Sequence, residues 1–443
     1  MARCALLAIF IFFIAPRIKA QLPYTNNIYS GNGVNAHVSG TFYKEKIYVA
    51  SKTSNPFFYE LNRFNSIGIH EQTLSFSTDS NIINDNCGKC LQANNNRLYH
   101  VIANANFTDR NYLLLFKFPL SLDSILLIDT LWVPPIDFGI DSTEGILPWA
   151  TQFDSDSTFL ITGQLGALPS PTQQYRFDLF LARVDTNFNV LWMKVVPDNN
   201  LLRPFGLIGS DIEIDAYGGI VVTGNPYFWS YQTGFAARFR ASDGQLLWKK
   251  EYTPDLGFGI SNMFVVDNQD GSYQYAMNEW TDGFGGVNLV KHGEMDTMGN
   301  LVNSSYIGNR FNPNSPGLRS NFAQDFLRTH DGNYYIAGVA FAGGQFGFGA
   351  KFTRTGDSLW YREYTHGGWS SNGPVFPPLE QGWIEWFIQK PDSSFLHIGW
   401  NQNNYTPVLS TWILNTDKHG CDTLGCETIG LEEFTPTVAW KIY

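Results

Sequence analysis

The sequence has few charged residues and, beyond its first residues, no long apolar run. Asp, Glu, Lys and Arg make up only 16% of the 443 residues, no more than the aromatic residues. A low Lys and Glu content with 41 glycines argues against a helical bundle and favours many short strands joined by tight turns. No stretch after residue 20 is apolar enough to span a bilayer, so we expect no membrane insertion. The hydrophobic fraction of 44% argues against disorder.

Positive charge and catalytic motifs are also scarce. The 29 Lys and Arg residues are outnumbered by 40 Asp and Glu, which gives a net charge of −11 and argues against a nucleic-acid partner. The eight His residues are scattered, with no H-E-x-x-H zinc motif, and neither a G-x-S-x-G elbow nor a P-loop is present. We therefore predict no catalytic residue, no metal and no cofactor.

Two acidic pairs offer alternatives to that prediction. Asp267 and Asp270 lie in a D-x-x-D-G turn that could hold Ca²⁺, although a plain turn is the better interpretation. Asp211 and Glu213 are two positions apart on an expected strand, share one face, and could serve glycoside chemistry. Nothing in the sequence shows a sugar site beside that pair.

The first twenty residues are typical of a secretory signal peptide. A basic start is followed by an eleven-residue apolar run from Ala5 to Ala15, and the small residue Ala20 offers a cleavage site before Gln21. The alternative is an uncleaved anchor helix, for which the run is short. We expect residues 1–20 to be removed and the protein to be secreted or displayed on the cell surface.

Four cysteines follow the expected signal peptide. Cys87 and Cys90 form a C-x2-C motif, and Cys421 and Cys426 form a C-x4-C motif. An even count in an exported chain favours disulfides, within or between the two motifs. One four-cysteine zinc site is the alternative.

Seven similar segments recur along the chain. In each, an apolar strand ends in a small residue or, once, in Met, and the closing positions are separated by 53 to 61 residues: 50, 103, 163, 224, 277, 338 and 399. Repeats of this length are typical of propellers or arrays.

Each repeat contains further strand and turn signals. Asp-Gly and Gly-Gly turns separate alternating apolar and polar segments, and an outer segment carries Trp-x-x-x-Tyr, as in Trp248–Tyr252 and Trp360–Tyr364. Four antiparallel strands per repeat predict an all-β, seven-bladed β-propeller with four-stranded antiparallel blades. A linear β-solenoid is the alternative, but its rungs are usually shorter.

The propeller is expected over residues 21–430. Its predicted blades lie near residues 35–78, 82–134, 143–198, 204–254, 256–310, 315–366 and 376–430. The last repeat lacks a Trp-x-x-x-Tyr segment, so we predict that residues 22–29 supply its outer strand. A loose N-terminal tail is the alternative.

The repeats and the C-terminal residues resemble a known class of secreted proteins. The Asp/Gly-rich turns and Trp-Lys-Lys-Glu-Tyr at 248–252 are similar to propeller repeats in Gram-negative cargo of the type IX secretion system. Cys421 to Cys426, Gly430 to Glu433 and Trp440 to Tyr443 resemble the linker that precedes the sorting domain of that cargo, although the usual Pro-Asn-Pro does not follow. The resemblance implies that residues 431–443 are such a linker, and that export machinery is a partner through a C-terminal domain missing from this sequence. An ordinary frayed terminus is the alternative.

Long connections on one face of the expected propeller carry many aromatic residues. Long loops on a rigid scaffold are common binding sites, and aromatic rings with nearby Asn and Asp suit sugars or peptide side chains. We predict the following ligand-binding residues: Tyr227, Trp229, Tyr231, Trp280, Phe346, Trp369, Trp383 and Trp400. The alternative is that these rings only pack beneath the loops.

Two functional classes follow from this interpretation. The first is a secreted or surface scaffold that binds a glycan or a protein, and the second is an extracellular carbohydrate-active enzyme with carboxylate catalysis. Two free carboxylates in the central opening would favour the enzyme, whereas aromatic residues without such a pair would favour the binding scaffold.

Overall fold

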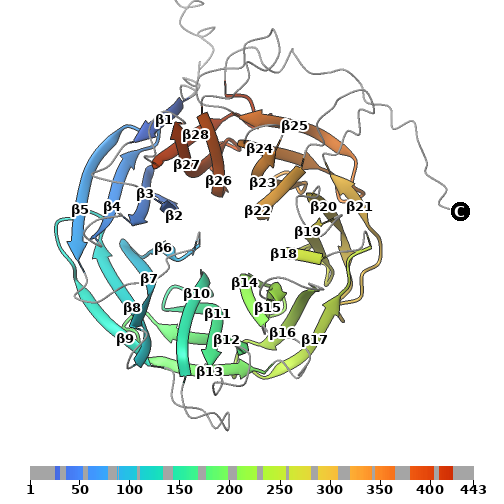
Figure 1. Cartoon of the computed structure of the whole chain (residues 1–443), viewed down its shortest axis with the longest axis horizontal. Coiled ribbons are helices and arrows are strands. Elements are labelled where there is room, and N and C mark those ends of the chain that lie inside the picture. Colours follow the sequence, from blue (N-terminus) through green and yellow to red (C-terminus); the bar gives the residue numbers. More distant parts are fainter. Residues whose placement is uncertain are drawn as a thin grey trace, which may run out of the picture.

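A computed structural model shows a ring of seven four-stranded antiparallel sheets around a central axis (Figure 1). It describes residues 25–29, 36–52, 58–77, 87, 89–106, 110–132, 143–167, 176–197, 207–226, 233–255, 259–280, 288–307, 320–341, 345–364, 380–403 and 409–422. The predicted all-β, seven-bladed propeller is confirmed. None of the described segments is a helix with the length and apolarity needed to cross a membrane.

Blades 1 to 3 follow one another along the chain. Blade 1 contains β2 (Ala36–Tyr43), β3 (Lys46–Lys52), β4 (Phe58–Asn65) and β5 (His70–Ser77). Blade 2 contains β6 (Leu91–Asn94), β7 (Arg97–Asn106), β8 (Arg110–Pro119) and β9 (Leu127–Trp132). Blade 3 contains β10 (Thr143–Phe153), β11 (Thr158–Ala167), β12 (Arg176–Asp185) and β13 (Val190–Val196).

Blades 4 to 6 continue the same order, with the first strand of each nearest the axis (Figure 1). Blade 4 contains β14 (Leu207–Ile214), β15 (Gly219–Pro226), β16 (Gly234–Arg240) and β17 (Leu246–Tyr252). Blade 5 contains β18 (Gly259–Asp267), β19 (Tyr273–Trp280), β20 (Asn288–Met295) and β21 (Ser305–Ile307). Blade 6 contains β22 (Ser320–Arg328), β23 (Tyr334–Phe341), β24 (Gln345–Phe352) and β25 (Ser358–Tyr364).

Blade 7 combines the two ends of the ring. It contains β26 (Glu380–Gln389), β27 (Phe395–Asn403) and β28 (Leu409–Thr416), and its outer strand is β1 (Thr25–Tyr29). β1 runs antiparallel to β28, with Thr25 opposite Asn415 and Tyr29 opposite Thr411. Residues 25–29 of the segment 22–29 therefore provide the strand that the last repeat lacks. The expected signal peptide (1–20) and the expected linker (431–443) lie outside the described residues.

The apolar core is divided among the blade interfaces. Seven clusters of buried residues each join side chains from two neighbouring blades, and one of them joins blade 7 to blade 1 through Trp386, Ile398 and Ile47. A single four-stranded sheet cannot bury both of its faces, whereas stacking the blades in a closed ring buries them all. Burial of this apolar area is the main stabilising contribution to the ring.

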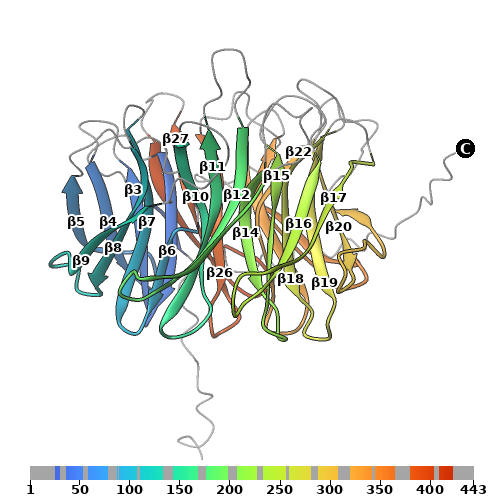
Figure 2. The same ribbon diagram turned by 90° about the horizontal axis from the view of Figure 1, so that it is seen from below.

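Recurring polar turns set the limits of the strands. Asp185, Asp296 and Asp417 each accept backbone N–H bonds from the residues two and four positions later. Such Asx turns satisfy the backbone groups at a chain reversal, which explains why these Asp residues recur after the third strand of a blade. Figure 2 shows the described turns, including those after the inner strands, gathered on one side of the ring, here called the turn face.

Candidate functional site

Most of the inner strands share an irregularity in their pairing. Six of them shift register by one residue against their neighbouring strand: β2, β10, β14, β18, β22 and β26. A bulge of this kind turns side chains out of regular alternation and is common next to functional sites. The residues directly after it in blades 4, 5 and 6 are Asp211, Asn262 and Asp325. Three neighbouring blades therefore present polar residues near the axis.

Blade 2 supplies the cation that faces these residues. Lys89 lies between Cys87 and Cys90, two residues before the short strand β6. Its Nζ lies 2.7 Å from Oδ1 of Asp211 and 2.6 Å from Oδ1 of Asp325. The axial ion cluster of Lys89, Asp211 and Asp325 thus links blades 2, 4 and 6 across the centre. Its carboxylate side chains are only 4% and 5% exposed, while the Lys89 side chain is 22% exposed.

Burial and charge pairing oppose one another in this cluster. Burial raises the pKa of Asp211 to about 6, although the Lys89 ammonium opposes that shift. Burial lowers the pKa of Lys89, but the attraction of Asp211 and Asp325 outweighs burial and leaves that pKa above its usual range. The Lys89 ammonium and the Asp211 carboxylate therefore each stabilise the charged form of the other. Asp211 would have to break its contact with Lys89 before it could act as a proton donor or acceptor.

The proposed pair of Asp211 and Glu213 is not a free pair of carboxylates. Burial raises the pKa of Glu213 to about 8, and its Oε1 accepts a hydrogen bond of 2.8 Å from the backbone N–H of Asp267. Asp211 is occupied by Lys89. The two residues therefore have structural partners on different blades, which leaves little chemistry for them to perform together.

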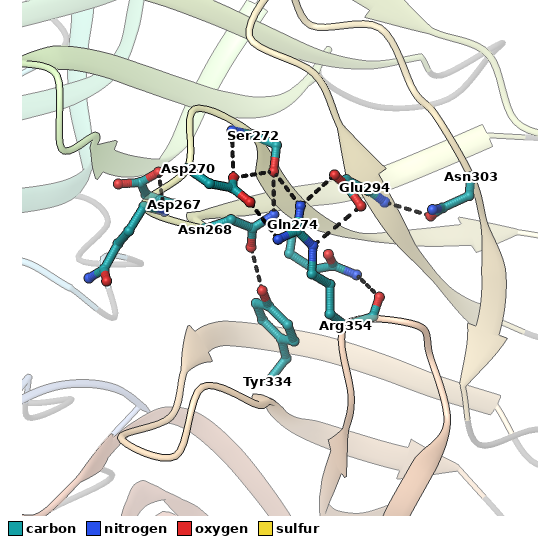
Figure 3. Close-up of polar contacts among 10 residues, drawn as sticks. Asp267, Asn268, Asp270, Ser272, Gln274, Glu294, Asn303, Tyr334 and Arg354 are labelled. Carbon is teal, nitrogen blue, oxygen red and sulfur yellow. Dashed lines mark hydrogen bonds and ion pairs between the residues drawn. The ribbon is translucent and has the colours of Figure 1, made fainter.

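The turn that contains Asp267 and Asp270 also has a structural role (Figure 3). Oδ2 of Asp270 accepts a bond of 2.6 Å from Arg354 of blade 6, and Arg354 also binds Glu294 at 2.6 Å. The oxygens of Asp267 accept backbone N–H groups of Gln269 and Ala216. Within the described ranges, no group of three or more His, Cys, Asp or Glu is placed to hold a metal ion.

Four aromatic side chains gather where blades 6 and 7 meet. The Trp383 ring stacks on Trp400 with centroids 5.6 Å apart and an interplanar angle of 20°. It also lies 6.3 Å from the ring of Phe322 and 6.0 Å from that of Phe341. All four side chains are partly exposed. Phe322, Phe341, Trp383 and Trp400 are called the aromatic cluster below.

The bulges connect the aromatic cluster to the axis. Phe322 and Trp383 occupy equivalent positions, because each lies one residue before the start of the bulge in its inner strand. Glu385 is the residue inserted by the bulge of β26, and its Oε1 accepts a bond of 3.0 Å from Nε1 of Trp400. Asp325 follows the bulge of β22. The two clusters are therefore linked through β22, in which Phe322 precedes the bulge and Asp325 follows it.

The structure brings only part of the predicted set together. Trp383 and Trp400 form the stacked pair, but they lie within strands rather than in loops. Trp280 ends β19 and Phe346 lies near the start of β24, and both are partly exposed without a ring contact to the aromatic cluster as far as the structure describes it. Four other predicted residues lie outside the described residues: Tyr227, Trp229, Tyr231 and Trp369.

Three residues of this region did not stand out in the sequence. The only sequence signal for Lys89 is its position inside the C-x2-C motif. Asp325 and Glu385 depend on bulges, which place them where regular alternation would not. An acidic residue within a repeat's first strand is a weak signal that could have drawn attention to both.

The structure describes three of the four cysteines that follow residue 20. Cys87 and Cys90 form a disulfide, so they cannot take part in a four-cysteine zinc site. Cys421 is fully buried and disulfide-bonded, and Cys426 lies outside the described residues. The short disulfide loop holds the backbone around Lys89, whose carbonyl oxygen accepts bonds from the hydroxyl and N–H of Thr151 in blade 3.

A pocket of about 400 Å³ lies elsewhere, at the rim between blades 3 and 4. Its lining includes Lys194, Phe239 and Gln245. The pocket lies beside the turn that precedes β17 in blade 4. Its lining has no cluster of titratable groups with shifted pKa values, so it is not assigned as the functional site.

Comparisons with known proteins establish the fold. No protein-family model and no curated protein sequence matches the chain. The structure of an ulvan lyase of polysaccharide lyase family PL25, bound to -[GlcA(1-4)Rha3S]-, has a TM-score of 0.53 and 11% identity, covering 92% of this chain and 98% of that one. A second ulvan lyase structure gives 0.52 and 11% over the same shares. Polysaccharide lyase Uly1 gives 0.47 and 10%, over 91% and 94%. The chain thus shares a propeller fold with enzymes that act on polysaccharides.

Proposed function

We propose that this chain is a glycan-binding propeller and that the aromatic cluster stacks on sugar rings. The observation that carries the proposal is the partly exposed stack of Trp383 on Trp400, bordered by Phe322 and Phe341. The apolar face of a pyranose packs well on aromatic rings, and polar groups around the rings bind its hydroxyls. Glu385 is one such acceptor.

The axial ion cluster supports binding rather than catalysis. Asp211 and Asp325 lie near one another, as a pair of glycosidase carboxylates would, but Lys89 contacts both and little of either is exposed. A buried ion pair of this kind stabilises a particular arrangement of the blades, and removing one partner is costly. The axial ion cluster is therefore assigned to linking blades 2, 4 and 6.

Single substitutions of the two tryptophans test the proposal. An array of plant, algal, fungal and bacterial glycans would first identify the glycan that the intact chain binds. Trp383→Ala and Trp400→Ala should then each weaken that affinity at least tenfold, measured by calorimetry. Tyr217→Ala is the matched control, because Tyr217 is 66% exposed in a turn on the turn face. Unchanged affinity in both tryptophan variants would refute the proposal, and retention of only protein partners would favour the protein-binding alternative.

A second candidate function is polysaccharide cleavage. It is favoured by the fold shared with ulvan lyases and by the two axial carboxylates. Incubation of the chain with the bound glycan, followed by assays for new reducing ends and for unsaturated products, tests this candidate. Product formation that is lost in Asp325→Asn would make the chain an enzyme; the absence of product would leave the binding function.

We also propose that the chain acts outside the cell. The support is the signal-peptide pattern of residues 1–20 and the resemblance of the repeats to type IX cargo. Expression of residues 1–443 in a Gram-negative host, with N-terminal sequencing of the exported product, should give a mature chain that starts at Gln21. A cytoplasmic product that retains Met1 would contradict the proposal.

A further inference from the structure

We infer that the hydrogen bond between His397 and Tyr335 is an acid-sensitive link between blades 6 and 7, and that its opening at low pH weakens ligand binding at the aromatic cluster. The inference specifies a regulation of the proposed glycan-binding site and rests on that proposed function. It follows from the strands that the two residues join, from the atoms that they use and from their surroundings.

His397 and Tyr335 join two strands that also carry part of the aromatic cluster. Nε2 of His397 in β27 lies 2.6 Å from the hydroxyl oxygen of Tyr335 in β23. Trp400 lies three residues after His397 in β27, and Phe341 lies six residues after Tyr335 in β23. Movement of β27 away from β23 at His397 would therefore change how the rings of blade 7 meet those of blade 6.

The partners of the imidazole determine which nitrogen carries the hydrogen. Nδ1 of His397 lies 3.3 Å from the carbonyl oxygen of Leu414, which can only accept, so Nδ1 is the donor. Nε2 of the neutral ring is then the acceptor, and the Tyr335 hydroxyl donates to it. A proton that binds Nε2 displaces the Tyr335 hydrogen and ends this hydrogen bond in its present form.

The link is enclosed by aromatic rings. His397 and Tyr335 are both 0% exposed. Three further aromatic rings have centroids 5.4–6.3 Å from that of the imidazole: Tyr364, Phe387 and Phe395. A positive charge on a side chain buried in this way loses its hydration, so protonation favours an interface that has opened to water.

The charged groups around His397 do not favour its protonation. β23, β27 and β28 carry no Asp, Glu, Lys or Arg. Burial lowers the pKa of His397 to about 3, the bond to the Leu414 carbonyl opposes that shift, and the charge of Lys390 adds to it. The charged groups on the other elements packed around His397 are in β25, β26 and the turns after β26 and β28: Arg362, Glu385, Lys390, Asp392, Asp417 and Asp422.

The direction of the pH effect follows from these surroundings. In the open interface, His397 has an ordinary pKa of about 6.5 and binds a proton that the closed interface excludes. The closed interface is therefore fully favoured above about pH 6.5 and becomes less favoured as the pH falls toward 3. The opening constant should rise about 30-fold between pH 7.5 and pH 5.

A second buried histidine differs from His397 in its hydrogen bond. Nε2 of His292 lies 2.6 Å from the hydroxyl oxygen of Ser305, which belongs to the same blade 5. The His292 ring packs on Phe352 of blade 6, with centroids 4.5 Å apart. Protonation of His292 would disturb this packing, but the hydrogen bond to Ser305 does not join two blades.

Hydroxyl-radical footprinting without any glycan measures the opening directly. We expect the side chains of Tyr335, Phe387 and Phe395 to be oxidised at least fivefold faster at pH 5 than at pH 7.5. Tyr99 and Phe159 are buried between blades 2 and 3 and should show no such increase. An unchanged rate at the three residues, or an equal increase at both interfaces, would overturn the inference.

His397→Gln tests whether the histidine causes the acid response. Glutamine keeps an oxygen that can accept the Tyr335 hydroxyl but takes up no proton, so the increase in oxidation at pH 5 should be lost. His70→Gln is the matched control, because His70 is an exposed histidine at the start of β5 in blade 1, and it should respond like the parent. A parent-like response in His397→Gln would overturn the role of His397.

Tyr335→Phe tests the other side of the link. This change keeps the ring and removes the hydroxyl, so Nε2 of His397 loses its donor. Oxidation of Phe387 and Phe395 should then be faster than in the parent already at pH 7.5. Rates equal to those of the parent would show that this hydrogen bond does not hold blades 6 and 7 together.

Calorimetry at the two pH values connects the link to the proposed function. The affinity of the parent for the glycan identified on the array should be at least fivefold weaker at pH 5 than at pH 7.5, and that of His397→Gln should change less than twofold. Opening without a loss of affinity would overturn the regulation and leave glycan binding intact. Binding to no glycan would refute the proposed function and its regulation, whereas the footprinting would decide separately whether the link is acid-sensitive.

Discussion

The hydroxyl of Tyr252 in blade 4 donates a hydrogen bond of 2.9 Å to the carbonyl oxygen of Gly299 in blade 5. Four residues earlier, Nε1 of Trp248 donates to the carbonyl oxygen of Thr297 at 3.0 Å. Tyr364 in blade 6 makes the same type of bond, of 3.1 Å, to Gly420 in blade 7. The Trp-x-x-x-Tyr segment of an outer strand is therefore a clamp that binds the outer turn of the next blade.

Gly299 should be a sensitive position in this clamp. Its φ is +78°, and a Cβ there would lie 2.8 Å from the Trp248 ring. Gly218 has a similar φ of +75°, but a Cβ added at Gly218 would have no other heavy atom within 4 Å. Gly218→Ala should destabilise the fold by about 1 kcal/mol through backbone strain alone. Gly299→Ala should cost about 1–3 kcal/mol more because the Trp248 ring must shift. Denaturant unfolding of both variants measures the difference, and equal losses would show that the ring contact contributes nothing.

Removal of the axial cation should be more damaging than removal of the whole axial ion cluster. Lys89→Met leaves Asp211 and Asp325 buried without their partner, which should cost about 3–5 kcal/mol of unfolding free energy. Lys89→Met combined with Asp211→Asn and Asp325→Asn should recover most of that loss, since no charge remains unpaired. Thermal unfolding at pH 7 compares the two. A triple variant less stable than Lys89→Met would mean that the ion pairs themselves stabilise the ring.

Glu213 should make the protein less stable as the pH rises. Its pKa is raised to about 8 in the folded state against 4.5 in the reference state, so only the unfolded state ionises between these values. Glu213→Gln removes this penalty and can still accept the Asp267 N–H. It should be more stable than the parent by roughly 1–3 kcal/mol at pH 8 and equal to it near pH 4. Urea unfolding at both pH values checks this; a gain of the same size at pH 4 would exclude ionisation as the cause.

The Cys87–Cys90 disulfide should stabilise the fold modestly, because it closes a very short loop. Replacing both cysteines with serine should cost about 2 kcal/mol if the constraint on the unfolded chain dominates. Reductant should still lower the stability of this double variant, since Cys421 is also disulfide-bonded. Unfolding curves with and without reductant provide the measurement. A loss as large as that of Lys89→Met would show that the disulfide also holds Lys89 in place.

The sequence predicts the number of blades because local signals repeat in each one. Asp residues in turns and Trp-x-x-x-Tyr segments report interactions within a blade or with the next blade, and these recur at a regular spacing. The absence of that segment from the last repeat similarly pointed to the N-terminal residues, where β1 pairs with β28.

The axial ion cluster follows no repeated signal. Lys89 and Asp211 are 122 residues apart in the sequence, and they come into contact only because the closed ring brings blades 2 and 4 to the same central axis. The bulges that turn Asp211 and Asp325 toward Lys89 insert single residues without a distinctive composition. For the same reason, Trp383 and Trp400 stand out in the sequence as aromatic residues, whereas Glu385 beside them has only the weak signal of an acidic residue within an inner strand.

The pairing of β1 with β28 also constrains how the ring is assembled. Six blades can form in order as the nascent chain emerges. Blade 7 is completed only when β28, which is synthesised last, pairs with β1, which is synthesised first. Such a distant contact is expected to close late, and until then β28 has an unpaired edge. A second copy that meets this edge can donate its own β1, so crowded refolding should yield strand-exchanged dimers from the same contact that seals the monomer.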